Sequence, residues 1–314
     1  MFPEPHFVDT NGIRMAVHEQ GEGPPVILLH GFPELAFSWR HQIPALAAAG
    51  YRAIAPDQRG YGRTSVPPRV SDYRVEELIG DIHGLLDALE LDSAVFVGHD
   101  MGTILLWQMA MLAPERIDKL VMLNIPHYQR PPLDPVSIWR RRFGKEFYIV
   151  NFQDSDESDR VFAANTAHFF DVTMRRNQVP RAIFDKMPKE RKVISLLRPL
   201  AREKQSGEPL LSEDERNYYA TAFAASGFTG AINWYRNWKH NWEVLEGVDY
   251  TIDIPTLFIG AIDDLIIAPE HIEAMRPLVT NLEIHILEDC GHWSQQEKPD
   301  EVNRLMLEWL VQQR

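Results

Sequence analysis

The segment SAVFVGHDMG, residues 93–102, decides the fold class. It begins as a short apolar run that is typical of a buried strand and leads into residues 101–113, whose apolar spacing is helical. Gly98 and Gly102 lie two residues before and two residues after Asp100. A tight turn from strand to helix needs small residues at both places, because the flanking chains pass close by. We therefore predict that Asp100 lies on a strained elbow between a strand and a helix.

Short apolar runs recur along the chain and predict strands that are buried on both faces. Helical patterns such as residues 75–89 separate them, which favours a parallel sheet covered by helices on both sides. An antiparallel hairpin of residues 7–10 and 13–19 is predicted before them, because Asn11-Gly12 suits a two-residue turn. We therefore predict an α/β fold with a mostly parallel eight-stranded sheet. The buried runs are residues 26–29, 51–55, 94–97, 120–123, 256–259 and 282–287.

Within residues 129–247 this alternation stops, and helical stretches rich in aromatic residues, such as 159–170, take its place. The stretch holds 19 Lys and Arg against 16 Asp and Glu, whereas the rest of the chain holds 13 against 29. Such a shift in charge marks a separate unit. We expect a helical cap domain of residues 129–246, inserted into a core domain of residues 1–128 and 247–314. It would cover the carboxyl ends of the strands, where open α/β sheets bind ligands.

The composition excludes several classes of protein. With 314 residues, 45% of them hydrophobic, the chain is typical of a globular protein, and its net charge of −13 disfavours nucleic acid and anionic membranes as partners. Cys290 is the single cysteine, and residues 1–10 lack the pattern of an export signal, so we expect a cytoplasmic protein that does not span a membrane. No motif indicates a metal site, and no cofactor is expected. The sequence leaves open whether the chain forms a homo-oligomer.

An aspartate at the elbow restricts the chemistry to substrates with a reactive sp³ carbon. A serine that attacked such a carbon would leave an ether, which is a dead end, whereas a carboxylate leaves an alkyl ester that water can hydrolyse. Asp100 as nucleophile therefore indicates epoxides or alkyl halides as substrates. The chain contains no G-x-S-x-G motif, so a serine esterase would have no nucleophile.

Hydrolysis of the ester needs a base, and His292 is preferred among the 12 histidines because it follows the last predicted strand. The acid that orients it should follow another late strand, where Asp263 and Asp264 are adjacent and periodicity does not separate them. The backbone N–H groups of Phe32 and Met101 are expected to form an oxyanion hole. That hole would hold the charge on the side-chain oxygen of the aspartate when water attacks the ester.

Four motifs, in their order and spacing, closely resemble those of the soluble epoxide hydrolases of the α/β-hydrolase superfamily. They are HGFPE (30–34), GHDMG (98–102), NWYRN (233–237) and EDCGHW (288–293). The last two are diagnostic of that family, and the similarity spans nearly the whole chain. The resemblance implies an α/β-hydrolase fold and an enzyme that converts an epoxide and water to a vicinal diol. Two-domain members carry a further N-terminal phosphatase domain, and no phosphatase activity is expected here.

The resemblance also implies roles for the polar residues of the core. Asp100 corresponds to the nucleophile and His292 to the base. Asp264, rather than Asp263, corresponds to the orienting acid, because the acid of the family is followed by one residue and then a branched aliphatic pair, as in the sequence DLII of residues 264–267.

Two cap tyrosines of the family protonate the epoxide oxygen, and Tyr235 and Tyr148 resemble them. Phenols suit this task because their ordinary pKa near 10 keeps them protonated at neutral pH. An alternative for Tyr148 is a packed aromatic residue of the cap. Pro33 and Trp293, which belong to the matching motifs, are expected to contact a small, neutral, apolar epoxide.

Met101 and Thr103 depart from many relatives, which have Trp after the nucleophile and Gly-Gly beyond it. We expect this departure to change the pocket and not the oxyanion hole, which uses a backbone N–H. The nearest alternative function is a haloalkane or haloacid dehalogenase with the same nucleophile, but Met101 cannot donate to a departing halide as the usual Trp does. A ligand-binding protein without turnover would be expected to lose part of the catalytic set.

Overall fold

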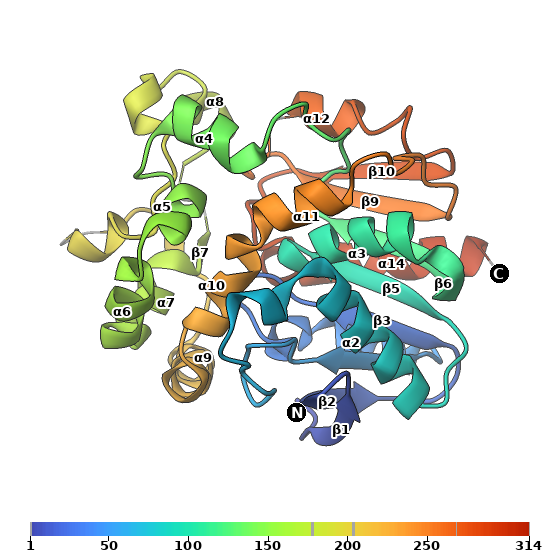
Figure 1. Cartoon of the computed structure of the whole chain (residues 1–314). Helices are drawn as coiled ribbons and strands as arrows, with labels where there is room; N and C mark the ends of the chain where they lie inside the picture. Colours follow the sequence, from blue (N-terminus) through green and yellow to red (C-terminus); the bar gives the residue numbers. More distant parts are fainter. Residues whose placement is uncertain (1, 177–178, 203–204, 268, 314) are drawn as a thin grey trace.

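A computed structural model describes residues 2–176, 179–202, 205–267 and 269–313. An eight-stranded sheet in the order β1-β2-β4-β3-β5-β6-β9-β10 forms its centre (Figure 1). β2 pairs antiparallel with β1 and β4, and the remaining neighbours are parallel. This confirms the predicted α/β fold. The strands are β1 (His6–Thr10), β2 (Ile13–Gln20), β3 (Pro25–Leu29), β4 (Arg52–Pro56), β5 (Ala94–His99), β6 (Ile117–Leu123), β9 (Thr256–Ala261) and β10 (Leu282–Leu287).

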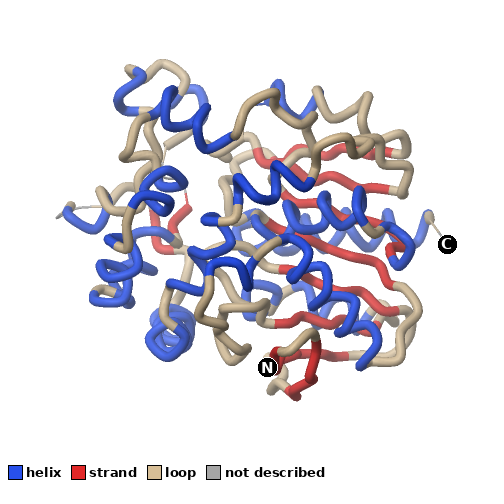
Figure 2. Tube along the Cα trace, viewed as in Figure 1, coloured by secondary structure: helices blue, strands red, loops and turns tan. Residues whose placement is uncertain are grey.

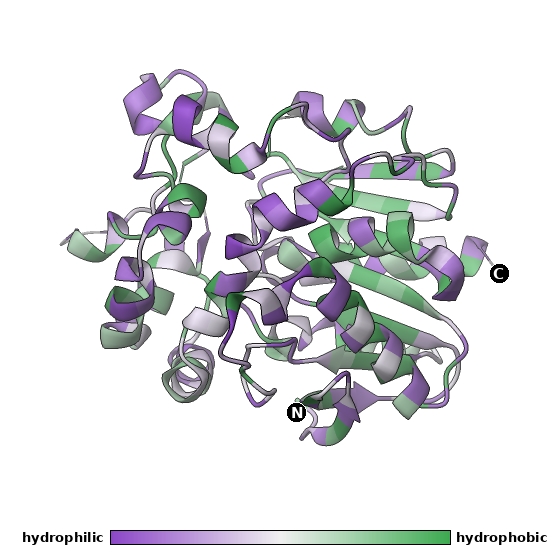
Figure 3. Ribbon diagram, viewed as in Figure 1, coloured by the Kyte–Doolittle hydropathy of each residue, from purple (hydrophilic) through white to green (hydrophobic). Residues whose placement is uncertain are grey.

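Helices cover both faces of the sheet, as predicted (Figure 2). The helices packed on the sheet are α1 (Gln42–Ala48), α2 (Val75–Ala88), α3 (Met101–Leu112) and α14 (Pro299–Gln312). Successive side chains of a strand point to opposite faces. In β5, Val95 and Val97 therefore belong to one hydrophobic cluster with α1 and α14, whereas Phe96 belongs to another with α2 and α3. Figure 3 shows hydrophobic residues concentrated along the strands.

Backbone torsions and burial test two local predictions. Asn11 and Gly12 have φ values of 42° and 75°, as a two-residue hairpin turn requires. The run of residues 282–287 does form β10, but the prediction that both of its faces are buried is wrong. Because β10 lies at the edge of the sheet, only Leu287 of its six residues is buried, and Ile286 is 38% exposed.

The inserted segment is mainly helical. Its helices α4 to α9 lie together beyond one end of the sheet (Figure 1). The stretch 159–170, expected to be one helix, is divided at Asn165, and the short pair β7–β8 was not predicted. The elements are α4 (Pro135–Phe143), α5 (Tyr148–Asp154), α6 (Glu157–Ala164), α7 (Thr166–Thr173), β7 (Arg175–Arg176), α8 (Arg181–Phe184), β8 (Glu208–Pro209), α9 (Glu213–Ser226), α10 (Thr229–Arg236) and α11 (Trp238–Val244).

Shorter helices complete the chain. They are α12 (Pro269–Glu273), α13 (Ser294–Glu297) and the 3₁₀ helices η1 (Ala36–Trp39), η2 (Val70–Tyr73), η3 (Pro114–Arg116), η4 (Lys189–Arg191) and η5 (Pro199–Ala201). In the described part of the chain, no helix combines the length and the apolar character needed to cross a membrane.

The parallel register brings the carboxyl ends of the central strands together. Leu29 at the end of β3 pairs with Gly98 in β5, and Leu123 at the end of β6 pairs with Ile259 in β9. The residues that follow these strands therefore meet along one edge of the sheet, where open α/β sheets bind ligands. The ring of Phe32, just beyond β3, lies 5.5 Å from a ring on the inserted helix α10, so this edge faces the insertion.

Candidate active site

Asp100 lies on the predicted elbow between β5 and α3. Its backbone has φ 50° and ψ −117°, a conformation that residues other than glycine rarely adopt. A Cβ atom on Gly102 would collide with the carbonyl oxygen of Leu29, and one on Gly98 would lie 2.8 Å from the backbone nitrogen of Thr103. The two glycines are thus needed for the close approach of chains that places Asp100 at the end of β5.

The two oxygens of the Asp100 carboxylate have different partners. The backbone N–H of Phe32 donates to Oδ1, with 2.9 Å between nitrogen and oxygen. Met101 is the first residue of α3, so its N–H has no acceptor within the helix. Oδ2 lies 3.6 Å from Nε2 of His292. One oxygen therefore lies beside a donor of the predicted oxyanion hole, and the other faces the predicted base.

His292 is oriented by Asp264, whose side chain is 2% exposed. Nδ1 of His292 lies 3.0 Å from Oδ2 of Asp264. Asn124 donates to the same oxygen at 2.9 Å, and the N–H of Ile266 donates to Oδ1 at 2.9 Å. Of the two aspartates that the sequence pattern leaves open, Asp264 is the one that contacts His292. The carboxylate of Asp263 instead accepts a hydrogen bond from a backbone N–H of the insertion.

The surroundings of Asp264 and His292 set the protonation states of both side chains. Burial alone would raise the pKa of Asp264, but the charge and hydrogen bond of His292 lower it. Burial likewise opposes the charged form of His292, but Asp264, then Asp100 and Glu34, raise the pKa of His292 to about 9. The imidazole of His292 is therefore protonated at neutral pH. Conversion of Asp100 to a neutral ester removes one of the charges that raise this pKa, and so favours the neutral imidazole that can act as a base.

Tyr148 and Tyr235 face the carboxylate from the insertion. Tyr148 begins α5, Tyr235 lies in α10, and their ring centroids are 5.8 Å apart in an edge-to-face contact. Burial, and after it the negative charge of Asp100, raise the pKa of both phenols well above the ordinary value. Both tyrosines therefore stay protonated and keep the hydrogen that a proton donor needs.

Comparisons with known proteins assign the family. The family model described as alpha/beta hydrolase fold matches residues 24–299. Epoxide hydrolase A of Mycobacterium tuberculosis is 38% identical over 98% of this chain and 98% of its own. The chain belongs to the epoxide hydrolases of the α/β-hydrolase superfamily. The crystal structure of epoxide hydrolase A from Mycobacterium thermoresistibile has a TM-score of 0.88 at 34% identity, with 98% of each chain covered. Bifunctional epoxide hydrolase 2 of Sus scrofa is 37% identical, and this chain spans about half (53%) of its length.

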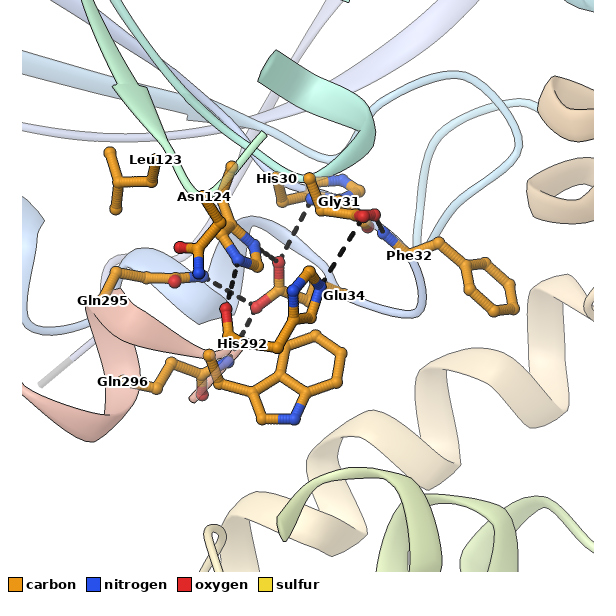
Figure 4. A network of polar contacts seen from close by, with 12 residues as sticks. His30, Gly31, Phe32, Glu34, Leu123, Asn124, His292, Gln295 and Gln296 are labelled. Carbon is orange, nitrogen blue, oxygen red and sulfur yellow. Dashed lines mark hydrogen bonds and ion pairs between the residues drawn. The ribbon is translucent and has the colours of Figure 1, made fainter. Parts of the chain in front are cut away.

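Beneath this hydrolase site lies a buried network that the sequence reasoning did not assign. Glu34 is fully buried and accepts hydrogen bonds from Nδ1 of His99 at 2.7 Å and from the side-chain amides of Gln295 and Gln296 at 2.8 and 2.7 Å (Figure 4). Nε2 of His99 lies 2.7 Å from the carbonyl oxygen of His292. Burial would raise the pKa of Glu34, but His99 lowers it, so the carboxylate stays charged. The signal in the sequence was Glu34 itself, a charged residue close to a predicted buried strand. A buried charge needs hydrogen-bond partners, so such a residue predicts a polar network around it.

Asn124 and Ser294 extend the network to the orienting acid. Oγ of Ser294 donates to Oδ1 of Asn124 at 2.6 Å, which leaves the amide nitrogen of Asn124 to donate to Asp264. The sequence analysis gave Asn124 no role. Asn124 has a φ of 68°, a left-handed conformation that asparagine adopts more readily than most residues. An asparagine directly after an apolar strand was therefore a usable signal in the sequence.

The remaining residues singled out from the sequence, which are Trp293, Pro33 and Thr103, are all buried. Trp293 is buried beside His292, with 4.7 Å between ring centroids, and its Nε1 donates to the carbonyl oxygen of Thr173 in α7 at 3.3 Å. Pro33 is also buried. The hydroxyl of Thr103 donates to the carbonyl oxygen of Leu123 at 3.1 Å, so its extra side chain is used in packing α3 on β6. Within the described residues, no group of three or more His, Cys, Asp and Glu side chains could hold a metal ion.

Proposed function

We propose that this protein hydrolyses small, neutral, apolar epoxides to vicinal diols through a covalent ester on Asp100. The observation that carries the proposal is the placement of the Asp100 carboxylate, with Oδ1 2.9 Å from the Phe32 nitrogen and Oδ2 3.6 Å from Nε2 of His292. The family of the chain and the names of its relatives support the same chemistry.

In the first step, Oδ2 of Asp100 attacks a ring carbon of the epoxide, and the bond between that carbon and the ring oxygen breaks. Tyr148 or Tyr235 gives its phenolic proton to the departing oxygen, which becomes the first hydroxyl of the diol. The products of this step are an alkyl ester of Asp100 and one tyrosinate. The high pKa of both phenols fits this role, because each holds its proton until a strong base, the forming alkoxide, takes it.

In the second step, His292 takes a proton from a water molecule that attacks Cγ of Asp100. The negative charge that develops on Oδ1 is stabilised by the backbone N–H groups of Phe32 and Met101. The intermediate collapses, His292 returns a proton to the leaving alkoxide, and the diol departs. The regenerated carboxylic acid then loses a proton, which balances the one that the phenol gave up in the first step. Asp264 orients His292 and stabilises its charge throughout.

We also propose that residues 129–246 form a cap domain on a core domain of residues 1–128 and 247–314. In support, the inserted helices α5 and α10 carry the two tyrosines against the edge of the sheet where Asp100 lies. A cytoplasmic location completes the proposal, since Cys290 is a buried free thiol.

Two assays test the function. A panel of styrene oxide, trans-stilbene oxide and alkyl halides is assayed for both diol and halide; we expect diol, and halide release at comparable rates would favour a dehalogenase instead. A single turnover in ¹⁸O-water tests the covalent route. The oxygen that enters the diol should come unlabelled from Asp100, and the label should appear on the enzyme. Label in the diol of the first turnover would refute the ester intermediate.

A further inference from the structure

Arg181, the first residue of α8, contacts the loop that carries Asp264. Its backbone N–H donates to Oδ1 of Asp263, with 2.7 Å between nitrogen and oxygen. Its guanidinium Nη1 donates to the carbonyl oxygen of Ile267 at 2.6 Å and to that of Asp264 at 3.2 Å. A single residue of the insertion thus makes three hydrogen bonds to the short loop of residues 263–267.

The opposite side of the same loop is attached to the catalytic residues. The carboxylate of Asp264 binds His292 and Asn124, and the backbone N–H of Asp263 donates to the carbonyl oxygen of Cys290 at 3.0 Å, two residues before His292. The loop therefore lies between Arg181 on one side and the imidazole on the other. A shift of its backbone carbonyls would move the carboxylate of Asp264 relative to His292.

The guanidinium is held firmly enough to fix this loop. The Arg181 side chain is only 14% exposed, whereas its ion-pair partner Asp185, whose Oδ1 lies 2.9 Å from Nε, is 54% exposed. Hydrogen bonds from a charged donor are stronger than neutral ones, and partial burial limits competition from water. The two carbonyl contacts face inward, and the exposed ion pair with Asp185 orients the guanidinium from outside.

We propose that Arg181 is a positioning residue that holds the 263–267 loop from the side of the insertion, so that Asp264 stays aligned with His292. The proposal rests on the function given above, in which this pair activates water. In this proposal the carboxylate of Asp263 also has a role, because it accepts the hydrogen bond that holds the start of α8. Asp100 is bound through Phe32 on a different loop, so loss of Arg181 should affect ester hydrolysis and leave ester formation almost intact.

The substitutions Arg181→Ala and Arg181→Lys isolate the guanidinium, because both keep the backbone N–H that binds Asp263. Arg276→Ala is the matched control. Arg276 follows α12, and among the described contacts its side chain pairs only with exposed Glu273. Stopped-flow traces with trans-stilbene oxide give the rate constants of ester formation and ester hydrolysis separately. In Arg181→Ala we expect hydrolysis to slow by roughly ten- to a hundredfold, as a misplaced catalytic group would cause, with ester formation within about twofold. Arg181→Lys should recover part of the loss.

A second readout follows the imidazole directly. The charged and titratable groups that face His292 are Asp264, Asp100, Glu34, His99 and Glu297. Of these, Arg181 touches only the loop of Asp264. A looser Asp264 should therefore lower the pKa of His292, measured by ¹⁵N NMR of histidine-labelled protein and assigned with a His292→Gln spectrum. A loss of stability alone would leave this pKa unchanged in the folded protein.

The outcomes separate the proposal from its premise. Slower hydrolysis together with a lower His292 pKa in Arg181→Ala, and neither change in Arg276→Ala, would support it. Equal loss of both steps with an unchanged pKa would overturn it and make Arg181 an ordinary packing residue, as would wild-type behaviour. If the wild-type protein formed no ester, the proposed function would fail, and the NMR comparison would still decide whether Arg181 positions Asp264.

Discussion

The two sides of the site are held together by different forces. On the side of the sheet, hydrogen bonds of 2.6–3.0 Å hold Asp100 to Phe32 and hold His292 to Asp264 and the residues behind it. On the side of the insertion, Tyr148 and Tyr235 are held mainly by aromatic contacts, with Phe152 5.7 Å and 5.2 Å from their ring centroids. Charged groups are thus aligned by directional bonds, and the phenols mainly by packing.

The difference corresponds to the chemistry assigned to each side. A buried carboxylate or imidazolium needs fixed partners, because an unpaired charge is costly in the interior. A neutral phenol can be placed by packing and keeps its proton in a dry pocket. We therefore expect substitutions on the sheet side to change ester hydrolysis and those on the insertion side to change ring opening. Asp100 is the exception, since both steps pass through it.

The largest effect is expected for Asp100→Ala, because no nucleophile remains and neither side can act. Turnover of trans-stilbene oxide should fall by at least about 10⁴-fold, the order seen when the members of a catalytic set are removed. Diol formation is measured by chromatography. Asp118→Ala, an exposed position on β6, is the control and should keep full activity. Residual turnover within tenfold of the wild type would mean that water attacks the epoxide without Asp100.

His292→Gln separates the two sides of the site. It should slow hydrolysis by roughly 10³-fold while Asp100 is still alkylated, so the ester should accumulate. Intact-mass spectrometry after incubation with substrate should show an increase equal to one substrate molecule, located on Asp100 by peptide mapping. The absence of any mass increase in a folded variant would contradict the two-step mechanism.

Tyr235→Phe tests the insertion side and should slow ester formation by about 10- to 100-fold, as loss of one general acid does. The change removes only the hydroxyl and keeps the ring contact with Phe152. Because Tyr148 remains as a donor, the double variant with Tyr148→Phe should be far slower than either single variant. Hydrolysis of a preformed ester should hardly change. Stopped-flow traces with normal ester formation and slow ester breakdown would instead give Tyr235 a packing role.

Much of the sheet side could be predicted from the sequence, because it depends on local signals. The glycines around Asp100 and the apolar runs before each polar residue reflect backbone geometry and burial that act within a few residues. The hairpin at Asn11-Gly12 was predicted for the same reason. The edge position of β10 was not predicted, since an apolar run does not show whether a neighbouring strand follows.

Contacts between distant segments carried no local signal. Glu34 and Gln295 are 261 residues apart, and their hydrogen bond depends on the register of β3 with β5 and on where α13 begins. Arg181 reaches the Asp264 loop across 83 residues, from a segment whose composition indicated only a separate helical unit. The break at Asn165 was missed as well, because the aromatic pattern continues through it.

The smallest predicted effect concerns pH, and it tests whether the charge of Asp100 controls the base on the same side of the site. In the free enzyme the pKa of His292 is about 9, since Asp264, Asp100 and Glu34 outweigh the effect of burial. In the ester, Asp100 is neutral, and the pKa of His292 should fall below 9. Hydrolysis needs the unprotonated imidazole, so its rate constant should rise with pH and reach half of its plateau below pH 9.

Single-turnover measurements of ester decay between pH 6 and 10 check this directly. The pKa of His292 in the free enzyme, measured by ¹⁵N NMR, provides the reference value, and the kinetic midpoint should lie on its acidic side. Ester formation should show no such rise, because that step does not use His292 as a base. A kinetic midpoint equal to or above the pKa of the free enzyme would mean that esterification leaves the imidazole unaffected. His292 would then owe its raised pKa to Asp264 and Glu34 alone, and its change to a base would need another cause, such as water excluded by the bound product.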